Sequence, residues 1–431
     1  MKNSIKYILV TLMIVIMSVT LMACTVNEKT EIETYDIDGE VLRVGIISDS
    51  QLSPKGEEDI KYNNLKQSLT VLKNNDVDMI LFAGDIGDLG KVPVYDLYNK
   101  AIDQVFGDQR PIIQTIMSNH DYWENGTPYN CRRLFEKKMG HSPWSHYVVG
   151  GYHFIGASPA YGGMDDGYKE VAGWLKKELD KAVADDPDKP IFVTTHNYAV
   201  DTAYGSDEWG DRYINDIFKD YPQVVNFGGH SHYSILDERA IHQENYTTIT
   251  TQSVSYTELE TGKENGTIPP NADKTPMGLI MDVSSDEIVI HRYNFSVQYG
   301  LSGYEEKDPW ILPTTLNKQN FSYTNSIRMA NNEAPQMTAA SGSSFVKEGK
   351  IYLRFSAGKD DDFVHSYKIE WSNGTSQLYF SDFYNGLSAM ATTVDLEILN
   401  MPQGNYTAKI YAVDSWGRVS DNYTEIVDVA I

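Results

Sequence analysis

Short apolar runs alternate with amphipathic segments over the first two thirds of the chain. The runs at 41–47, 78–83, 111–117 and 190–195 have the length and β-branched content of buried strands. Apolar residues at helical spacing lie between the first two runs and before the fourth: Ile60, Leu65, Leu69 and Leu72, then Trp174, Leu175, Leu179 and Ala182. Strands separated by helices predict βαβ units with a buried sheet. The runs at 147–157 and 246–254 predict strands without intervening helices, which favours a mixed α/β sandwich over a purely parallel fold.

The pattern changes after residue 300. Residues 314–344 are rich in Asn, Ser and Thr and predict a linker. The remainder alternates with a period of two, which predicts the strands of a small all-β sandwich: Ile351, Leu353 and Phe355, then Tyr367, Ile369 and Trp371, then Tyr406, Ala408, Ile410 and Ala412. We therefore expect an α/β domain over 41–313 and a β-sandwich domain over 345–431.

The N-terminus has the charged-then-apolar order of a secretory signal. Lys2 and Lys6 precede an apolar run over 8–22 that is short for a membrane span. The run ends Leu21-Met22-Ala23-Cys24, which resembles the lipobox of bacterial lipoproteins. That resemblance implies a signal peptide over 1–23, lipidation of Cys24 and anchoring to the outer side of a bacterial cell membrane. Residues 24–40 are then expected to form a tether, and an uncleaved signal anchor is the alternative.

Composition narrows the function classes. The chain has 60 acidic and 36 basic residues and a net charge of −24, which disfavours a protein that grips nucleic-acid backbones. Only two cysteines occur, so the sequence supports neither a disulfide framework nor a thiolate-rich zinc site. Any bound metal must therefore use oxygen and imidazole ligands.

Polar side chains collect where the predicted strands end. The five blocks are Asp49-Ser50-Gln51, Gly84-Asp85-Ile86-Gly87-Asp88, Ser118-Asn119-His120-Asp121, Thr195-His196 and Gly229-His230-Ser231-His232. Such strand ends converge at one edge of a sheet. Each block alone is weak evidence, because an aspartate after a strand is commonly a turn former or a helix cap. Together they supply the carboxylate, amide and imidazole ligands that suit two closely spaced divalent ions.

In their order and rough spacing, these blocks resemble the signature of the calcineurin-like binuclear metallophosphoesterases over about residues 41–300. The resemblance implies a four-layer αββα sandwich with two divalent or trivalent ions of Mn, Fe or Zn. It implies that one ion is held by Asp49, Gln51, Asp85 and His232, and the other by Asp85, Asn119, His196 and His230. His120, paired with Asp121, would face the reacting phosphoryl group. Two such ions about 3.5–4 Å apart share a hydroxide and stabilise an in-line displacement.

Three positions depart from the family pattern. Gln51 stands where a histidine is usual, and its harder amide oxygen favours manganese, although a minority of the family also carry glutamine there. Ser118 replaces a glycine, which is tolerable unless the backbone requires a positive φ. Leu89 replaces the arginine that contacts phosphate in the protein phosphatases of the family, which disfavours phosphoproteins as substrates.

The last ninety or so residues resemble a fibronectin type III or immunoglobulin-like module. Gly404-Asn405-Tyr406-Thr407 leads to Tyr411-Ala412-Val413-Asp414-Ser415-Trp416-Gly417, with a candidate tyrosine corner at Tyr406. Such a module is usually a spacer or a binding accessory. A cell-envelope glycan on a platform of Trp371 and Trp416 is one hypothesis for it, and packing of both rings in the core is favoured.

We therefore predict an exported, lipid-anchored, monomeric metal-dependent phosphoesterase. Its substrate is expected to be a small phosphomonoester, phosphodiester or nucleotide-type pyrophosphate, and not nucleic acid. The alternative is a non-catalytic surface adhesin or envelope-binding lipoprotein built on a degenerate phosphoesterase fold. Gln51, the missing arginine and the sandwich module motivate that alternative.

Overall fold

A computed structural model describes residues 30–123, 126–296, 303–338 and 342–431. The expected signal peptide and Cys24 lie outside the described residues. Within these ranges, no helix is both long enough and apolar enough to span a membrane.

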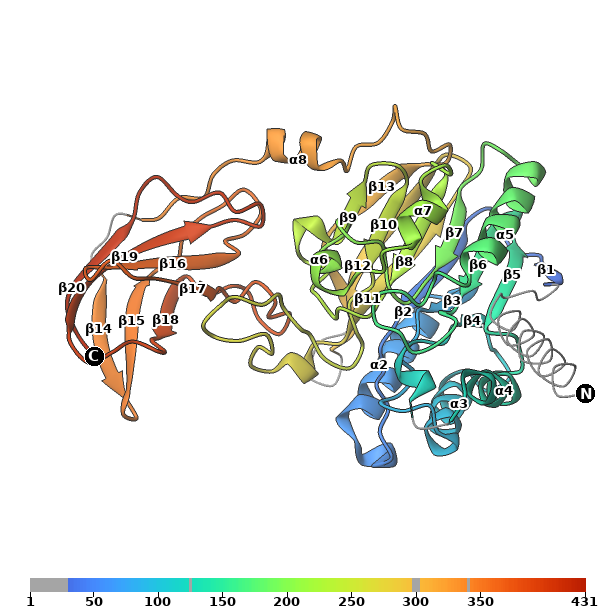
Figure 1. Cartoon of the computed structure of the whole chain (residues 1–431), viewed down its shortest axis with the longest axis horizontal. Coiled ribbons are helices and arrows are strands. Elements are labelled where there is room, and N and C mark those ends of the chain that lie inside the picture. Colours follow the sequence, from blue (N-terminus) through green and yellow to red (C-terminus); the bar gives the residue numbers. More distant parts are fainter. Residues whose placement is uncertain (1–29, 124–125, 297–302, 339–341) are drawn as a thin grey trace, which may run out of the picture.

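Two mixed β-sheets form the centre of the larger domain (Figure 1). The six-stranded sheet has the order β13-β12-β11-β2-β3-β4, and the seven-stranded sheet has the order β1-β5-β6-β7-β8-β10-β9. The first contains β2 (Leu42–Ile47), β3 (Met79–Phe82), β4 (Ile112–Thr115), β11 (Met277–Val283), β12 (Glu287–Asn294) and β13 (Tyr304–Pro313). The second contains β1 (Ile32–Tyr35), β5 (Trp144–Val149), β6 (Tyr152–Ala157), β7 (Ile191–Thr194), β8 (Val224–Gly228), β9 (Ile241–Gln243) and β10 (Thr247–Thr250).

Helices cover the outer face of each sheet. The six-stranded sheet is covered by α2 (Ile60–Asn74), α3 (Val92–Phe106) and α4 (Pro128–Met139). The other sheet is covered by α5 (Ala172–Asp185) and α7 (Ile214–Phe218), with the short α6 (Ser206–Trp209) nearby. Single 3-10 turns complete the domain: η1 (Gly56–Glu58), η2 (His120–Tyr122), η3 (Glu238–Ala240) and η4 (Ala272–Lys274).

The side-chain alternation of the strands explains the layering. In β2 and β3, Val44, Ile46 and Leu81 face the core between the two sheets. Ile80 and Phe82, which alternate with them, face the helices instead. Because successive side chains of a strand point to opposite faces, a strand that is apolar throughout must be covered on both sides. The predicted four-layer αββα sandwich is thereby confirmed.

The expectations for two segments need correction. The proposed tether over 24–40 contains β1, which pairs in parallel with β5 from Ile32 opposite His146 to Tyr35 opposite Val149. Strand pairing is invisible in a polar, acidic segment because the partner strand lies more than a hundred residues away. The run 147–157 is a hairpin of β5 and β6, and it turns at Gly150 and Gly151, which both have positive φ.

The C-terminal region is a separate β-sandwich, at the orange-to-red end of the chain in Figure 1. One sheet has the order β14-β15-β18 and the other β17-β16-β19-β20. Its strands are β14 (Ser343–Lys347), β15 (Lys350–Ser356), β16 (Ser366–Trp371), β17 (Ser376–Phe380), β18 (Thr393–Glu397), β19 (Asn405–Val413) and β20 (Thr424–Ala430). Trp371 is buried in the core between them, so it cannot serve as an exposed sugar platform. The hydroxyl of Tyr406 donates to the Pro402 carbonyl at 3.2 Å, as a tyrosine corner does.

The expected linker over 314–344 is largely ordered and attached to both domains. It contains α8 (Asn325–Asn331), and β14 begins inside it at Ser343. Arg328 on α8 forms an ion pair with Glu238 at 2.7 Å. On the sandwich side, the Asn332 amide donates to Asp414 at 2.7 Å. The composition rich in Asn, Ser and Thr predicted a linker, and this linker makes specific polar contacts with both domains.

Candidate active site

The five polar blocks converge at the carboxyl ends of strands from both sheets. Asp49 follows β2, Asp85 follows β3 and Asn119 follows β4, while the three histidines follow β7 and β8. Backbone hydrogen bonds join neighbouring loops: Asp49 N–H donates to the Gly84 carbonyl at 2.9 Å, Gln51 N–H to the Asp85 carbonyl at 3.0 Å, and Gly229 N–H to the His196 carbonyl at 2.8 Å. The sheet ladders therefore continue into the site and fix its loops.

Five of the candidate ligands adopt a left-handed backbone conformation. Their φ angles are 54° at Asp49, 46° at Gln51, 51° at Asp85, 68° at His230 and 59° at His232. A residue with a side chain pays on the order of 1–3 kcal/mol for such strain, which persists only where the surroundings enforce it. Strain of this kind concentrates at functional sites.

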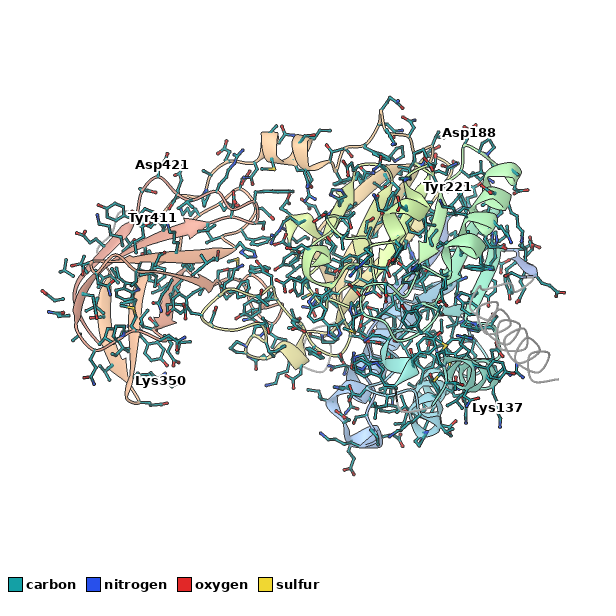
Figure 2. The ribbon with its side chains drawn as sticks, in the orientation of Figure 1. Lys137, Asp188, Tyr221, Lys350, Tyr411 and Asp421 are labelled. Atoms are coloured by element: carbon teal, nitrogen blue, oxygen red, sulfur yellow. The ribbon has the colours of Figure 1, made fainter. Side chains whose placement is uncertain are left out.

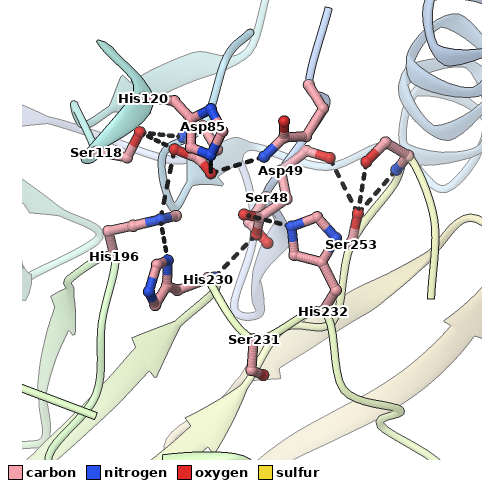
Figure 3. Close-up of polar contacts among 12 residues, drawn as sticks. Ser48, Asp49, Asp85, Ser118, His120, His196, His230, Ser231, His232 and Ser253 are labelled. Carbon is pink, nitrogen blue, oxygen red and sulfur yellow. Dashed lines mark hydrogen bonds and ion pairs between the residues drawn. The ribbon is translucent and has the colours of Figure 1, made fainter. Parts of the chain in front are cut away.

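Two groups of three side chains have ligand atoms within 4.8 Å of one another: Asp85, His196 and His230, and Asp49, Asp85 and His232. Asp85 belongs to both groups. Figure 3 shows Asp49 and Asp85 between the His196–His230 pair on one side and His232 on the other. All of these residues are buried. A carboxylate is the ligand type that can bridge two cations, so Asp85 stands in the bridging position.

The donor atoms of this cluster test whether metal ions fit it. Asn119 Oδ1 and His230 Nε2 are buried and have no hydrogen-bond partner within the described part of the chain, and the buried Asp49 Oδ1 faces His232 Nε2 at 3.2 Å. Leaving a buried polar atom without a partner costs about 1–3 kcal/mol, and each such group calls for an explanation. The two oxygens are among the atoms that the family pattern assigns to metal coordination. The residues present therefore fit a pair of cations.

The hydrogen bonds of the imidazole rings also fit. His196 Nδ1 lies 2.8 Å from the Ala83 carbonyl and His232 Nδ1 lies 3.2 Å from the Tyr256 carbonyl. In each ring Nδ1 carries the proton, which leaves the Nε2 lone pair directed into the cluster, as in metal-bound histidines. Burial, followed by the neighbouring His196, holds the pKa of His230 well below its ordinary value. A lowered pKa favours the neutral imidazole, which is the form that binds cations.

Gln51 reaches the cluster through its amide. Its Nε2 donates to Asp85 Oδ2 at 2.8 Å, and the side chain is 4% exposed. Rotation of the amide by half a turn would present Oε1 at the same place, and the two orientations have nearly the same shape. The amide is therefore placed to supply an oxygen to the Asp49–His232 side.

Asp121 does not orient His120, contrary to the prediction. Its buried carboxylate accepts hydrogen bonds from Ser118 N–H at 2.9 Å, Ser118 Oγ at 2.8 Å and Tyr95 Oη at 3.0 Å. Burial, followed by the charge of Asp85, raises the pKa of Asp121 to about 7. The adjacency of the two residues in sequence suggested a pair, but within the η2 turn their side chains point to different neighbours.

His120 is oriented by a backbone carbonyl instead. Its Nδ1 lies 3.0 Å from the Asp88 carbonyl, and its Nε2 lies 3.7 Å from Asp85 Oδ2. The ring packs on Trp123, with 3.9 Å between centroids. The side chain is 22% exposed, so its Nε2 side can meet a ligand at the cluster.

Sequence reasoning missed three residues that support the site. The Ser118 hydroxyl accepts a hydrogen bond from Asp85 N–H at 2.8 Å, so it connects Asp85 with Asp121. Ser253 Oγ donates to the Asp49 carbonyl at 3.0 Å, and the Tyr256 ring lies 4.3 Å from the His232 ring. Ser118 was visible as a departure from the family pattern, but the other two carried no sequence signal because they belong to none of the five blocks.

A cleft opens beside the cluster. Its volume is about 660 Å³, and its walls include Asp88 and Tyr256, which contact His120 and His232 respectively. The α2 side contributes Ser53 and Lys61, and the far wall is formed by residues between 255 and 273. A cleft of this size accommodates a small organic ligand.

Strand-end carboxylates, amides and imidazoles on a four-layer αββα sandwich are the arrangement expected of a metal-dependent hydrolase. Residues 42–234 match the family model of the calcineurin-like phosphoesterases. Residues 42–234 are thus similar to the calcineurin-like phosphoesterases, and the two ligand groups that share Asp85 offer two metal positions.

Several solved structures have a similar fold. One is a dimetal phosphatase from Danio rerio, which is 12% identical with a TM-score of 0.43; the match covers 64% of this chain and 100% of that one. A purple acid phosphatase from yellow lupin seeds is 14% identical over 64% of this chain and 54% of its own, with a TM-score of 0.47. An inner-membrane-complex anchor protein of Plasmodium is 17% identical over 65% of this chain and 93% of its own, with a TM-score of 0.42. No curated protein matches the chain in sequence.

Proposed function

We propose that this protein is an exported, lipid-anchored phosphoesterase that hydrolyses small phosphomonoesters, phosphodiesters or nucleotide-type pyrophosphates. The observation that carries the proposal is the pair of ligand groups that share Asp85, beside which the buried Oδ1 of Asn119 has no hydrogen-bond partner within the described residues. A cluster of this composition with no function would carry a cost in stability and no compensating gain.

The proposed ligands are Asp49, Gln51, Asp85 and His232 for one ion, and Asp85, Asn119, His196 and His230 for the other. Two bound ions would supply an acidified water and positive charge for the transition state. The oxygen-rich first set favours manganese there. Protonation of the departing oxygen is the task of the chain's own residues.

His120 is the proposed proton donor. Hydrolysis adds the oxygen of water to phosphorus, breaks the P–O bond to the departing group and returns one proton to the departing oxygen. Because Nδ1–H is used on the Asp88 carbonyl, the proton for that oxygen comes from Nε2 of the imidazolium form. Trp123 supports one face of the ring. The acidic Asp121 stabilises the turn that carries His120 and does not touch its ring.

The proposal of export and lipidation depends on residues 1–24 alone. There, two lysines are followed by an apolar run and then by Leu-Met-Ala-Cys, an order that supports a cleaved lipoprotein signal. We further propose that the sandwich is a fibronectin type III-like module, which the sheet orders and the Tyr406 corner support.

The test is hydrolysis of bis(p-nitrophenyl) phosphate by protein stripped of metal and resupplied with manganese. The wild-type chain should release p-nitrophenolate, and Asp85→Asn and His120→Ala should each lower kcat by at least about 100-fold. A useful control is His141→Ala, because His141 lies outside the cluster and bonds the Ser142 carbonyl. Undiminished turnover in both site variants would reject the mechanism. If the wild-type chain binds its ligands but hydrolyses no phosphoester, the alternative of an adhesin is favoured.

A further inference from the structure

The cleft beside the metal cluster has one wall that reaches across to the other domain. We call residues 256–273 the bridging loop. Tyr256 begins it against the His232 ring, and Glu258 N–H donates to the His232 carbonyl at 3.1 Å. Further along, Ile268, Pro269 and Asn271 line the cleft. In Figure 1 the loop runs from the larger domain towards β17 of the sandwich.

The two halves of the bridging loop are bonded to each other. Thr257 N–H donates to the Ala272 carbonyl at 3.0 Å, and Leu259 N–H donates to the Thr267 carbonyl at 2.9 Å. The outgoing and returning segments of the loop are therefore held side by side by backbone hydrogen bonds. A constraint on its tip is transmitted to Ile268 and Pro269 in the cleft wall.

The tip is held by the edge strand of the sandwich. Glu264 N–H donates to the Leu378 carbonyl at 2.8 Å. The Asn265 side chain pairs with the Phe380 backbone in both directions, accepting from its N–H at 2.9 Å and donating to its carbonyl at 3.3 Å. Since β17 is an edge strand, the loop satisfies backbone groups that would otherwise face solvent.

Apolar packing reinforces these bonds. Leu259 of the loop forms a buried cluster with Phe363, Phe380 and Phe383 of the sandwich. The Phe363 and Phe383 rings are stacked with 4.7 Å between centroids. The cluster is separate from the main cores of both domains, so its burial depends on the two domains staying together.

A buried charged network lies beside the cluster. His365 of the sandwich is 3% exposed, and its Nε2 lies 3.2 Å from Glu260 of the loop. The same Nε2 lies 3.3 Å from a terminal nitrogen of Arg239. Arg239 forms a bidentate salt bridge with Asp237. Groups buried in this way must keep their partners, because an unpaired buried charge is costly.

We propose that the sandwich domain is a structural part of the active site: by fixing the bridging loop it sets the cleft that receives the organic group of the substrate. The inference rests on the proposed phosphoesterase activity. A cleft of about 660 Å³ fits an organic group of nucleoside size. The sandwich thus determines affinity for large esters and leaves the chemistry at phosphorus unchanged, which makes Asn265 and His365 positioning residues.

The test compares two esters that release the same chromophore: p-nitrophenyl phosphate, and the p-nitrophenyl ester of thymidine 5′-phosphate. Asn265→Ala should raise KM for the large ester roughly fivefold or more and leave kcat and the small ester within about twofold. His365→Ala should do the same. Asn265→Asp keeps the acceptor for Phe380 N–H and should restore most of the affinity.

The matched control is Lys350→Ala. Lys350 begins β15, far from the larger domain (Figure 2), and the change removes its exposed ion pair with Glu397 of β18. It should change neither ester. Equal effects on both esters, or no effect of Asn265→Ala and His365→Ala in chains with native circular dichroism, would overturn the proposal. If the wild-type chain hydrolyses neither ester, the proposed function itself fails, and this inference fails with it.

Discussion

The two halves of the metal cluster are built differently, although they share Asp85. In the proposed ligand sets, the Asp49 side has two carboxylates, one amide and a single imidazole, whereas the Asn119 side has one carboxylate, one amide and two imidazoles. Oxygen ligands suit hard cations and nitrogen ligands suit softer ones. One site can therefore offer two ions different environments, because the ligands that are not shared differ between its two halves.

The hydrogen bonds behind the ligands differ as well. On the Asn119 side, the ring of His230 lies 4.8 Å from that of His196, and its Nε2 has no partner within the described residues. On the Asp49 side, His232 Nδ1 bonds the Tyr256 carbonyl, and its Nε2 lies 3.2 Å from Asp49 Oδ1. We therefore expect the two halves to respond differently to substitution.

The largest expected effect is that of the shared ligand. Asp85→Asn should weaken binding of both ions by more than about 100-fold, because even outer-shell changes cost 10- to 100-fold. His196→Ala should release only the ion on the Asn119 side. Metal content after dialysis, measured by mass spectrometry, checks both. Retention of two ions by Asp85→Asn would show that the two halves do not share this residue.

A smaller effect should follow from exchanging the amide on the Asp49 side. Gln51→His makes that half resemble the other, and we expect its affinity for zinc to rise by about 10- to 100-fold relative to manganese. Competition between the two metals, followed by calorimetry, measures the change. The corresponding control is Gln104→His, since Gln104 lies on α3 and bonds Glu57 at the surface. An unchanged preference would mean that Gln51 does not contact an ion.

The smallest expected effect concerns the support beneath Asp85. Ser118→Ala leaves Asp85 N–H and one oxygen of Asp121 with one partner fewer, which should lower the free energy of unfolding by about 1–3 kcal/mol. Urea denaturation measures it. Thr70→Ala removes an exposed helix hydroxyl that bonds the Lys66 carbonyl and should change stability far less. Equal stability losses in the two variants would contradict a structural role for Ser118.

Much of the α/β domain could be predicted because its strands are marked locally. The runs 41–47, 78–83 and 190–195 correspond to β2, β3 and β7 within two residues, since fully buried strands are apolar throughout. The hairpin at 150–151 was hidden because both of its strands are also buried. β1 was missed since its stability comes from pairing with β5 and not from its own residues.

The candidate ligands were predictable for a similar reason, whereas their partners were not. Asp49, Asp85, Asn119, His196, His230 and His232 each follow a strand, so a local pattern reveals them. Besides Ser118, Asp121 bonds Tyr95 on α3, and His120 bonds the Asp88 carbonyl. No local rule connects such pairs, and the adjacency of His120 and Asp121 was misleading.

The amino-acid sequence by itself determined the types of ligand, their order and the strands that present them, because each depends on residues within a few positions of one another. Only the tertiary structure decided the left-handed backbone at Asp49, Asp85 and His232, the sharing of Asp85 and the docking of the bridging loop on β17. Those features arise from contacts between distant segments, whose strain and burial are compensated only once the whole fold has formed.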